Sequence, residues 1–183
     1  MTTVKPDPRQ DGTSSAASGS PAAPPAGRYE IDTTRSAVTF RTRHLFGLAP
    51  VRGSFAIRAG SIEVAGPVTD SRVHVEIEAA SFHTGNAMRD GAVRSPRLLD
   101  SGQHPVLTFS SGGTDGPALP GTLTVRGVTR PVSLLVEQTA ISPESFTARG
   151  TARIDRAEFG VTGYRGLAGR YLDMTVEVRA VRA

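Results

Sequence analysis

The sequence contains no cysteine and no tryptophan, and Lys5 is its only lysine. Because cysteine is absent, disulfide bonds, thiolate metal sites, cysteine nucleophiles and dithiol redox chemistry are all excluded. No apolar run approaches the roughly 18 to 20 residues that a membrane-spanning helix needs. Twenty glycines and thirteen prolines suit short strands and turns better than long helices.

The positive charge is carried almost entirely by arginine. The chain has 21 basic and 17 acidic residues, a net charge of +4. The arginines stand singly along alternating segments, whereas nucleic-acid-binding proteins usually cluster their charges and interleave aromatic residues. The pattern predicts solvated faces and no nucleic-acid partner, with a weak, transient contact with anionic membranes as the main alternative. The arginines concerned are Arg41, Arg43, Arg52, Arg58, Arg72, Arg149 and Arg153.

The first 27 residues differ from the rest. They are rich in serine, alanine, proline and glycine, and Val4 is their last large apolar side chain. Such a composition buries too little apolar surface to offset the entropy lost on ordering. The sequence therefore predicts a disordered tail over residues 1–27 and one folded domain over residues 28–183. The polar residues 11–20 occupy the place where a secretory signal would have its apolar stretch, which predicts a cytoplasmic location.

From Tyr29 onward apolar and polar residues alternate with a period of two, which is typical of antiparallel sheets with one buried face. Turn signals separate the runs at Ala59-Gly60, Gly66-Pro67, Gly112-Gly113, Arg126-Gly127 and Ser142-Pro143. About eight strands joined in this way predict a closed barrel or a sandwich. The alternating runs cover residues 38–41, 51–57, 73–79, 106–110, 122–126, 128–137, 146–154 and 172–180.

Residues 84–102 do not alternate. Within them, residues 87–90 and 96–100 resemble short helical turns. A strand-poor insert on a β-scaffold predicts either a lid at a cavity mouth or a packing plug.

No group of residues indicates catalysis or a metal site. The four histidines, His44, His74, His83 and His104, have no tight ligand spacing, and His74 belongs to a water-facing alternation. No Gly-x-Ser-x-Gly elbow and no phosphate-binding glycine loop occurs in a suitable context. On the insert, Asp90 is expected to cap the helical turn or to pair with Arg89 or Arg94. We therefore expect no catalytic residues, no metal and a protein that is not an enzyme.

Several motifs together resemble the YceI-like family, and the likeness covers essentially all of residues 28–183. The most specific part is the run from Gly121 to Val132. The other motifs are Tyr29-Glu30-Ile31-Asp32, Ser36-Ala37-Val38-Thr39-Phe40, His44-Leu45-Phe46-Gly47, Val51-Arg52-Gly53-Ser54-Phe55, Ser81-Phe82-His83-Thr84-Gly85-Asn86, Pro105-Val106-Leu107-Thr108-Phe109-Ser110 and Asp155-Arg156-Ala157-Glu158-Phe159-Gly160-Val161.

The resemblance implies a lipocalin-like, eight-stranded antiparallel β-barrel with a long apolar tunnel. It also implies a bound polyisoprenoid or isoprenoid-quinone lipid, with no other cofactor, and a carrier or sequestering role. The sequence departs from the family's pattern at Arg35, at Ala92 and at the pair Leu98-Leu99. Because these positions fall near the expected mouth, the resemblance leaves the headgroup undefined.

The inward-facing positions give the candidate ligand contacts. Sequence alone does not separate a filled core from a lined tunnel; the resemblance implies the tunnel. Asp90 and Arg94 are the candidate headgroup contacts at the mouth. Three alternatives stay open: a ligand-free interaction or stress-response module, an enzyme acting on a small hydrophobic substrate, and pairing into a homodimer through edge strands. The candidate tunnel residues are Val38, Phe40, Phe55, Val75, Ile77, Leu98, Leu99, Phe109, Val125, Leu134, Val136, Met174 and Val176.

Overall fold

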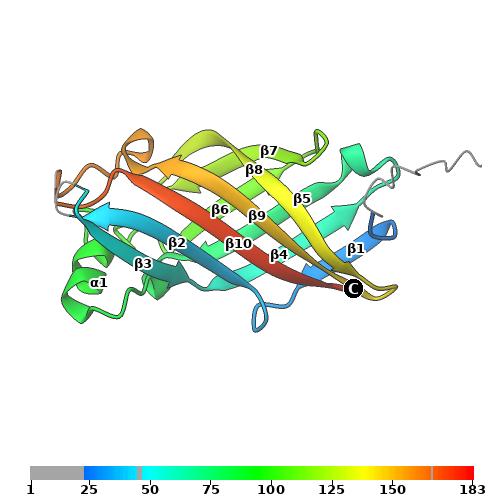
Figure 1. Cartoon of the computed structure of the whole chain (residues 1–183), viewed down its shortest axis with the longest axis horizontal. Coiled ribbons are helices and arrows are strands. Elements are labelled where there is room, and N and C mark those ends of the chain that lie inside the picture. Colours follow the sequence, from blue (N-terminus) through cyan, green and yellow to red (C-terminus); the bar gives the residue numbers. More distant parts are fainter. Residues whose placement is uncertain (1–22, 45–46, 166) are drawn as a thin grey trace, which may run out of the picture.

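The computed structural model describes residues 23–44, 47–165 and 167–183. Ten strand segments make a single sheet in which all neighbours are antiparallel, and the sheet forms an elongated barrel (Figure 1). The strands are β1 (Gly27–Ile31), β2 (Ala37–His44), β3 (Ala49–Phe55), β4 (Ile57–Val64), β5 (Arg72–Glu78), β6 (Val106–Ser111), β7 (Ala118–Val125), β8 (Val128–Ile141), β9 (Ser145–Asp155) and β10 (Tyr171–Arg182).

The barrel closes because β1 pairs with β4 on one side and with β10 on the other. β1 and β2 follow the same edge of β10, one after the other. β3 and β4 are likewise two parts of one strand, interrupted only at Ala56. The ten segments therefore correspond to eight barrel strands, and the predicted antiparallel β-barrel is confirmed.

The helices are short. α1 (Ala87–Arg94) lies in the predicted insert, and η1 (Val68–Asp70), η2 (Ala79–Ser81) and η3 (Arg156–Phe159) are single 3₁₀ turns. The Asn86 side chain caps α1 by accepting a hydrogen bond from the Arg89 N–H at 3.0 Å. Among the residues described, no helix combines the length and apolar character needed to cross a membrane.

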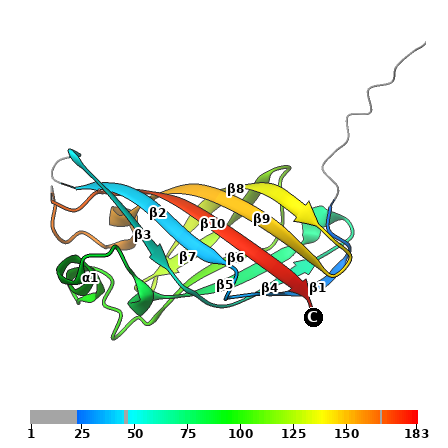
Figure 2. The same cartoon turned by 60° about the horizontal axis from the view of Figure 1, so that its bottom comes forward.

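Both cartoon views place α1, the start of β3 and the segment after β9 at one end of the barrel (Figures 1 and 2). We call this end the helical end. The C-terminus lies at the opposite end. On the free edge of β3 the sheet is continued by only a single bridge between Ser54 and His83 among the described residues. The segment that leads into the insert therefore touches the edge of β3 at this one bridge.

One predicted turn is wrong. Ala59-Gly60 lies inside β4, which runs through it with a local irregularity between Ile57 and Ala59. A Cβ atom on Gly60 would come within 2.6 Å of Ile31 Cδ1, so the glycine lets an inward isoleucine of β1 pack closely against the strand. The turn at Arg126-Gly127 is confirmed: both residues have positive φ, 52° and 73°, as a two-residue hairpin turn requires.

Most of the predicted tail, residues 1–22, lies outside the described residues. Residues 23–26 are placed against the barrel: Pro24 is buried, and the Tyr29 hydroxyl donates to the Pro25 carbonyl at 2.8 Å. Tyr29 itself is 0% exposed and meets Phe146 edge to face. Residues 23–26 therefore already contact the barrel, and the exact domain boundary stays a prediction.

Candidate functional site

The two halves of the barrel wall differ in how completely their inward side chains are buried. On β2, β3 and β5 many inward residues, such as Val38, Phe40 and Val75, are buried, although Thr42, His44 and Val73 are only half-buried. On β8 and β10 the inward residues, such as Val136 and Val176, keep part of their surface accessible. A tightly packed interior would bury both sets equally, so the difference indicates unfilled space inside the barrel.

Two cavities account for this space. The outer cavity lies at the helical end and measures about 130 Å³; the inner cavity measures about 120 Å³. Leu123, Ile154 and Met174 line both, so the cavities lie in series with these three side chains forming a waist between them.

The inner cavity exists because the inward face of β9 is made of very small residues. Ala148, Gly150 and Ala152 follow one another on that face and all line the cavity. Leu134 of β8 and Val176 of β10, on the two strands that flank β9, line the same cavity. Every described residue that lines the inner cavity is apolar, so this part of the interior suits a hydrocarbon chain.

The outer cavity ends in polar groups. Its lining is apolar except for Thr42, His44 and Arg156. Arg156 donates through Nε to the Gly169 carbonyl at 2.7 Å and through Nη2 to the Ala168 carbonyl at 3.0 Å, and a third bond reaches the Val161 carbonyl. The guanidinium thus fixes the loop after η3 across this end of the barrel.

His44 is held neutral by its surroundings. Burial lowers the pKa of its imidazole, and the positive charges of Arg89 and Arg156 lower it further. A neutral imidazole can both donate and accept a hydrogen bond. The polar end of the outer cavity therefore offers hydrogen-bond donors from a neutral ring and a cationic side chain.

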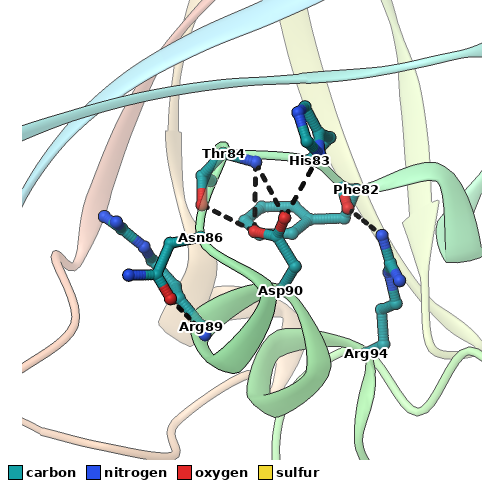
Figure 3. A network of polar contacts seen from close by, with 7 residues as sticks. All are labelled: Phe82, His83, Thr84, Asn86, Arg89, Asp90 and Arg94. Carbon is teal, nitrogen blue, oxygen red and sulfur yellow. Dashed lines mark hydrogen bonds and ion pairs between the residues drawn. The ribbon is translucent and has the colours of Figure 1, made fainter.

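The insert is held by a buried carboxylate (Figure 3). Asp90 is 3% exposed; it accepts from the Thr84 N–H at 3.0 Å and the Thr84 hydroxyl at 2.6 Å, and it pairs with His83 Nδ1 at 3.3 Å. Burial raises the pKa of Asp90, but the hydrogen bonds from Thr84 and the charges of His83 and Arg94 outweigh burial and hold it below its ordinary value. The expected ion pairs of Asp90 with Arg89 or Arg94 are not among the described contacts.

Asp90 and Arg94, predicted at the mouth, line neither cavity. Arg94 donates to the Phe82 carbonyl at 2.6 Å (Figure 3). Phe82 lines the outer cavity and stacks on Phe40, with ring centroids 5.2 Å apart. The two charged residues therefore support the cavity wall from behind, and direct contact with a headgroup remains only a prediction.

All thirteen predicted tunnel residues lie on the cavities. Leu98 and Leu99 of the insert are buried and form part of the wall of the outer cavity; both the lid and the plug stay predictions. The predicted residues on the outer cavity are Phe40, Phe55, Leu98, Leu99 and Val125; those on the inner cavity are Val38, Val75, Ile77, Phe109, Leu134, Val136 and Val176, and Met174 lines both.

Sequence reasoning missed the polar end. Thr42 and His44 continue the inward face of β2 that begins with Val38 and Phe40, so the period of two would have placed them inside had it been followed past Phe40. Arg156 has no comparable signal, because it stands in a 3₁₀ turn. Among the described residues, no three histidine or acidic side chains lie together as a metal-binding group.

A family model described as the YceI-like domain matches residues 29–181. The chain belongs to the YceI-like family. Similar proteins include a UPF0312 protein of Yersinia enterocolitica, 31% identical over 86% of this chain and 88% of that protein. A UPF0312 protein of Vibrio parahaemolyticus is 26% identical over the same shares of the two chains.

Solved structures share the fold at low sequence identity. BcnA of Burkholderia cenocepacia has a TM-score of 0.67 at 20% identity, covering 82% of this chain and 99% of its own. A polyisoprenoid-binding domain of Saccharophagus degradans has a TM-score of 0.69 at 15% identity, covering 85% and 98%. These likenesses confirm the lipocalin-like barrel fold.

Proposed function

We propose that this YceI-like protein binds a lipid with an isoprenoid tail, either a polyisoprenoid or an isoprenoid quinone, and carries or sequesters it. The observation that carries the proposal is the pair of apolar cavities in series inside the closed barrel. A flexible, branched hydrocarbon chain could pass the waist and occupy both, while a compact ligand would fill only one. The likeness in fold to the polyisoprenoid-binding domain of Saccharophagus degradans supports this ligand class.

The polar end of the outer cavity defines what the headgroup should be. His44 and Arg156 present N–H donors there, and no carboxylate lines this cavity among the described residues. Oxygen acceptors, such as the carbonyls of a quinone or the oxygens of a prenyl alcohol derivative, match such donors. The proposed orientation therefore places the headgroup at the helical end and the tail in the inner cavity.

We propose a binding role rather than catalysis. The chemistry of the cavity wall supports this: Thr42 donates to the Tyr171 carbonyl at 2.7 Å, and three of the five N–H groups of Arg156 donate to backbone carbonyls. The remaining N–H groups of Arg156 and the His44 ring are left to hold a headgroup. We also propose a cytoplasmic location, which cell fractionation with an antibody against the chain would test.

Mass spectrometry of lipids extracted from the gently purified protein tests the proposal. We expect a prenyl or quinone lipid in near-stoichiometric amount, and uptake of the same class from vesicles by the stripped protein. A Gly150→Val variant, which narrows the inner cavity, is purified in parallel and should retain less lipid than the wild type. Recovery of no such lipid together with no uptake from vesicles would refute the proposed function.

A further inference from the structure

A row of charges crosses the outer surface of the barrel at the helical end. The strand register aligns Arg52 of β3 with Arg41 of β2, Arg41 with Asp173 of β10, and Asp173 with Arg153 of β9. Three arginines and one aspartate thus stand side by side on four adjacent strands. Arg41 and Arg52 directly oppose each other, an arrangement of like charges that destabilises a sheet.

Two more arginines extend this row into a groove. Arg43 and Arg170 line the same outer groove as the three arginines of the row, and Asp173 is the only carboxylate among the described residues that line it. Asp173 lies 3.9 Å from Arg153, and Arg170 pairs with Asp155 at 2.7 Å. Within the described part of the chain no carboxylate lies within ion-pairing distance of the other three, Arg41, Arg43 and Arg52. We call the five residues Arg41, Arg43, Arg52, Arg153 and Arg170 the arginine groove.

The surroundings of the arginine groove are unusually apolar for such a charged surface. Tyr171 is 44% exposed, and the guanidinium groups of Arg153 and Arg170 lie 4.7 Å and 5.4 Å from its ring centre. Leu48 is 84% exposed just before β3, and Leu167 is 48% exposed in the loop after η3. Exposed aliphatic and aromatic side chains beside basic residues are the combination that binds a membrane interface.

The arginine groove lies directly outside the outer cavity. Thr42, Ala168 and Gly169 line both the groove and the cavity, so only this thin part of the wall separates them. The packing is tight, since a Cβ atom on Gly169 would clash with the Thr42 hydroxyl and the Arg43 carbonyl oxygen. A surface that contacts the groove therefore lies next to the end of the cavity where we place the headgroup.

We propose that the arginine groove docks this protein on the surface of a bilayer that contains anionic phospholipids. The uncompensated arginines match phosphate groups in charge and in bidentate geometry, and Leu48 and Leu167 can enter the interfacial layer beside them. The docking itself rests on charge and exposure alone. Its purpose, the exchange of cavity lipid with that bilayer, rests on the proposed function.

The expected strength of the effect follows from the number of arginines. Each basic residue near an anionic membrane surface strengthens binding about fivefold. Removing the three uncompensated charges should therefore weaken binding about a hundredfold, and salt should weaken the wild type in the same direction because the groove is exposed to solvent.

The test is cosedimentation of the full chain with vesicles of phosphatidylcholine, with and without phosphatidylglycerol. The groove variant is Arg41→Gln/Arg43→Gln/Arg52→Gln. The matched control is Arg28→Gln/Arg58→Gln/Arg72→Gln, which removes the same charge from exposed positions on β1, β4 and β5. Urea unfolding of both variants checks that the fold is retained.

We expect the wild type and the control to bind the anionic vesicles similarly, and the groove variant to lose about a hundredfold in affinity. Equal losses in both variants would overturn the proposal, because they would show an effect of net charge alone. Tighter binding to a DNA duplex than to anionic vesicles would overturn it in favour of a nucleic-acid partner. Titration of both variants with a short-tailed quinone in vesicle-free solution monitors the cavity separately, so a failure of docking and a failure of lipid binding give different results.

Discussion

Gly150 lines the inner cavity and permits a direct test of whether the barrel interior is open. Across the sheet it faces Val136 of β8 and Val176 of β10, and both of these line the cavity. A Cβ atom built on Gly150 would meet only the Leu134 side chain, at an ordinary contact distance of 3.7 to 3.8 Å. A Gly150→Val substitution therefore adds a Cβ atom without a clash and two methyl groups on the face that lines the cavity.

The expected change in stability has the opposite sign to the expected change in binding. Relief of the glycine's backbone entropy contributes about 0.5 to 1 kcal/mol, and cavity-filling changes commonly add a similar amount or more. We expect the lipid-free variant to be about 1 to 2 kcal/mol more stable than the wild type. Three carbons of lipid tail lose their place, which at about 0.8 kcal/mol per methylene predicts roughly fiftyfold weaker binding.

Urea unfolding of the lipid-free protein and calorimetric titration with a short-tailed isoprenoid quinone measure the two quantities. Gly53→Ala is the contrasting variant, since its Cβ would lie 2.6 Å from the His83 carbonyl oxygen and would clash with the ring of Phe40. We expect that variant to lose about 1 to 3 kcal/mol of stability through overpacking. Destabilisation of Gly150→Val by a similar amount would show that the interior is packed solid, and the tunnel would be refuted.

Three further predictions concern the waist, the insert and the polar end. Met174→Trp should close the waist, so that titration shows retained binding of a short-tailed quinone and loss of a long-tailed one; equal loss of both would contradict a tunnel in series. Asp90→Asn should cost about 1 to 3 kcal/mol at pH 7, because the bonds from Thr84 lose their charged acceptor. In the wild type, the lowered pKa of Asp90 predicts a loss of stability as the pH falls below about 4, and Asp90→Asn should show a smaller loss. An equal loss in both proteins, measured by urea unfolding across this pH range, would contradict this. Because the pKa of His44 is lowered on folding, wild-type stability should fall as the pH drops below about 6.5, whereas His44→Gln should lack this step; an identical pH profile would exclude His44 as its source.

The strands were predictable where alternation is unbroken. The run that became β5 and the run that became β10 alternate over their whole length, and both were found with nearly the observed bounds. β4 was broken at Ala59-Gly60 because glycine is a turn signal when it is seen alone. Gly60 is instead explained by the close approach of Ile31 from β1. This contact joins segments that are far apart in the sequence, and no local pattern encodes it.

The site was predictable on its apolar side and not on its polar side. The period of two identifies the residues that face inward, such as Val136 and Val176, and these residues line the inner cavity. Asp90 and Arg94 were predicted to contact a headgroup at the mouth, whereas the fold buries Asp90 against Thr84. Charged residues are placed by their partners, and these partners become known only once the insert has folded against the barrel.

The arginine groove illustrates the same limit at the surface. In the sequence its members stand singly from Arg41 to Arg170, and each one alternates with other residues as a solvated face would. Only the register of β3, β2, β10 and β9 brings Arg52, Arg41 and Arg153 into one row. A sequence pattern gives the side of a strand on which a charge lies, and the pairing of strands decides which charges become neighbours.

The energetics of lipid exchange connect the groove with the cavities. A bilayer is as apolar as the barrel interior, so transfer of an isoprenoid tail between them is nearly neutral at equilibrium. Crossing water is not neutral: exposing one five-carbon isoprene unit costs about 4 kcal/mol, and two units cost about 8 kcal/mol. Added to an activation barrier, about 8 kcal/mol slows exchange about a millionfold. A carrier that docks with its outer cavity against the membrane avoids this barrier. The arginine groove lies where such docking must occur, because the thin wall at Thr42, Ala168 and Gly169 separates it from the outer cavity.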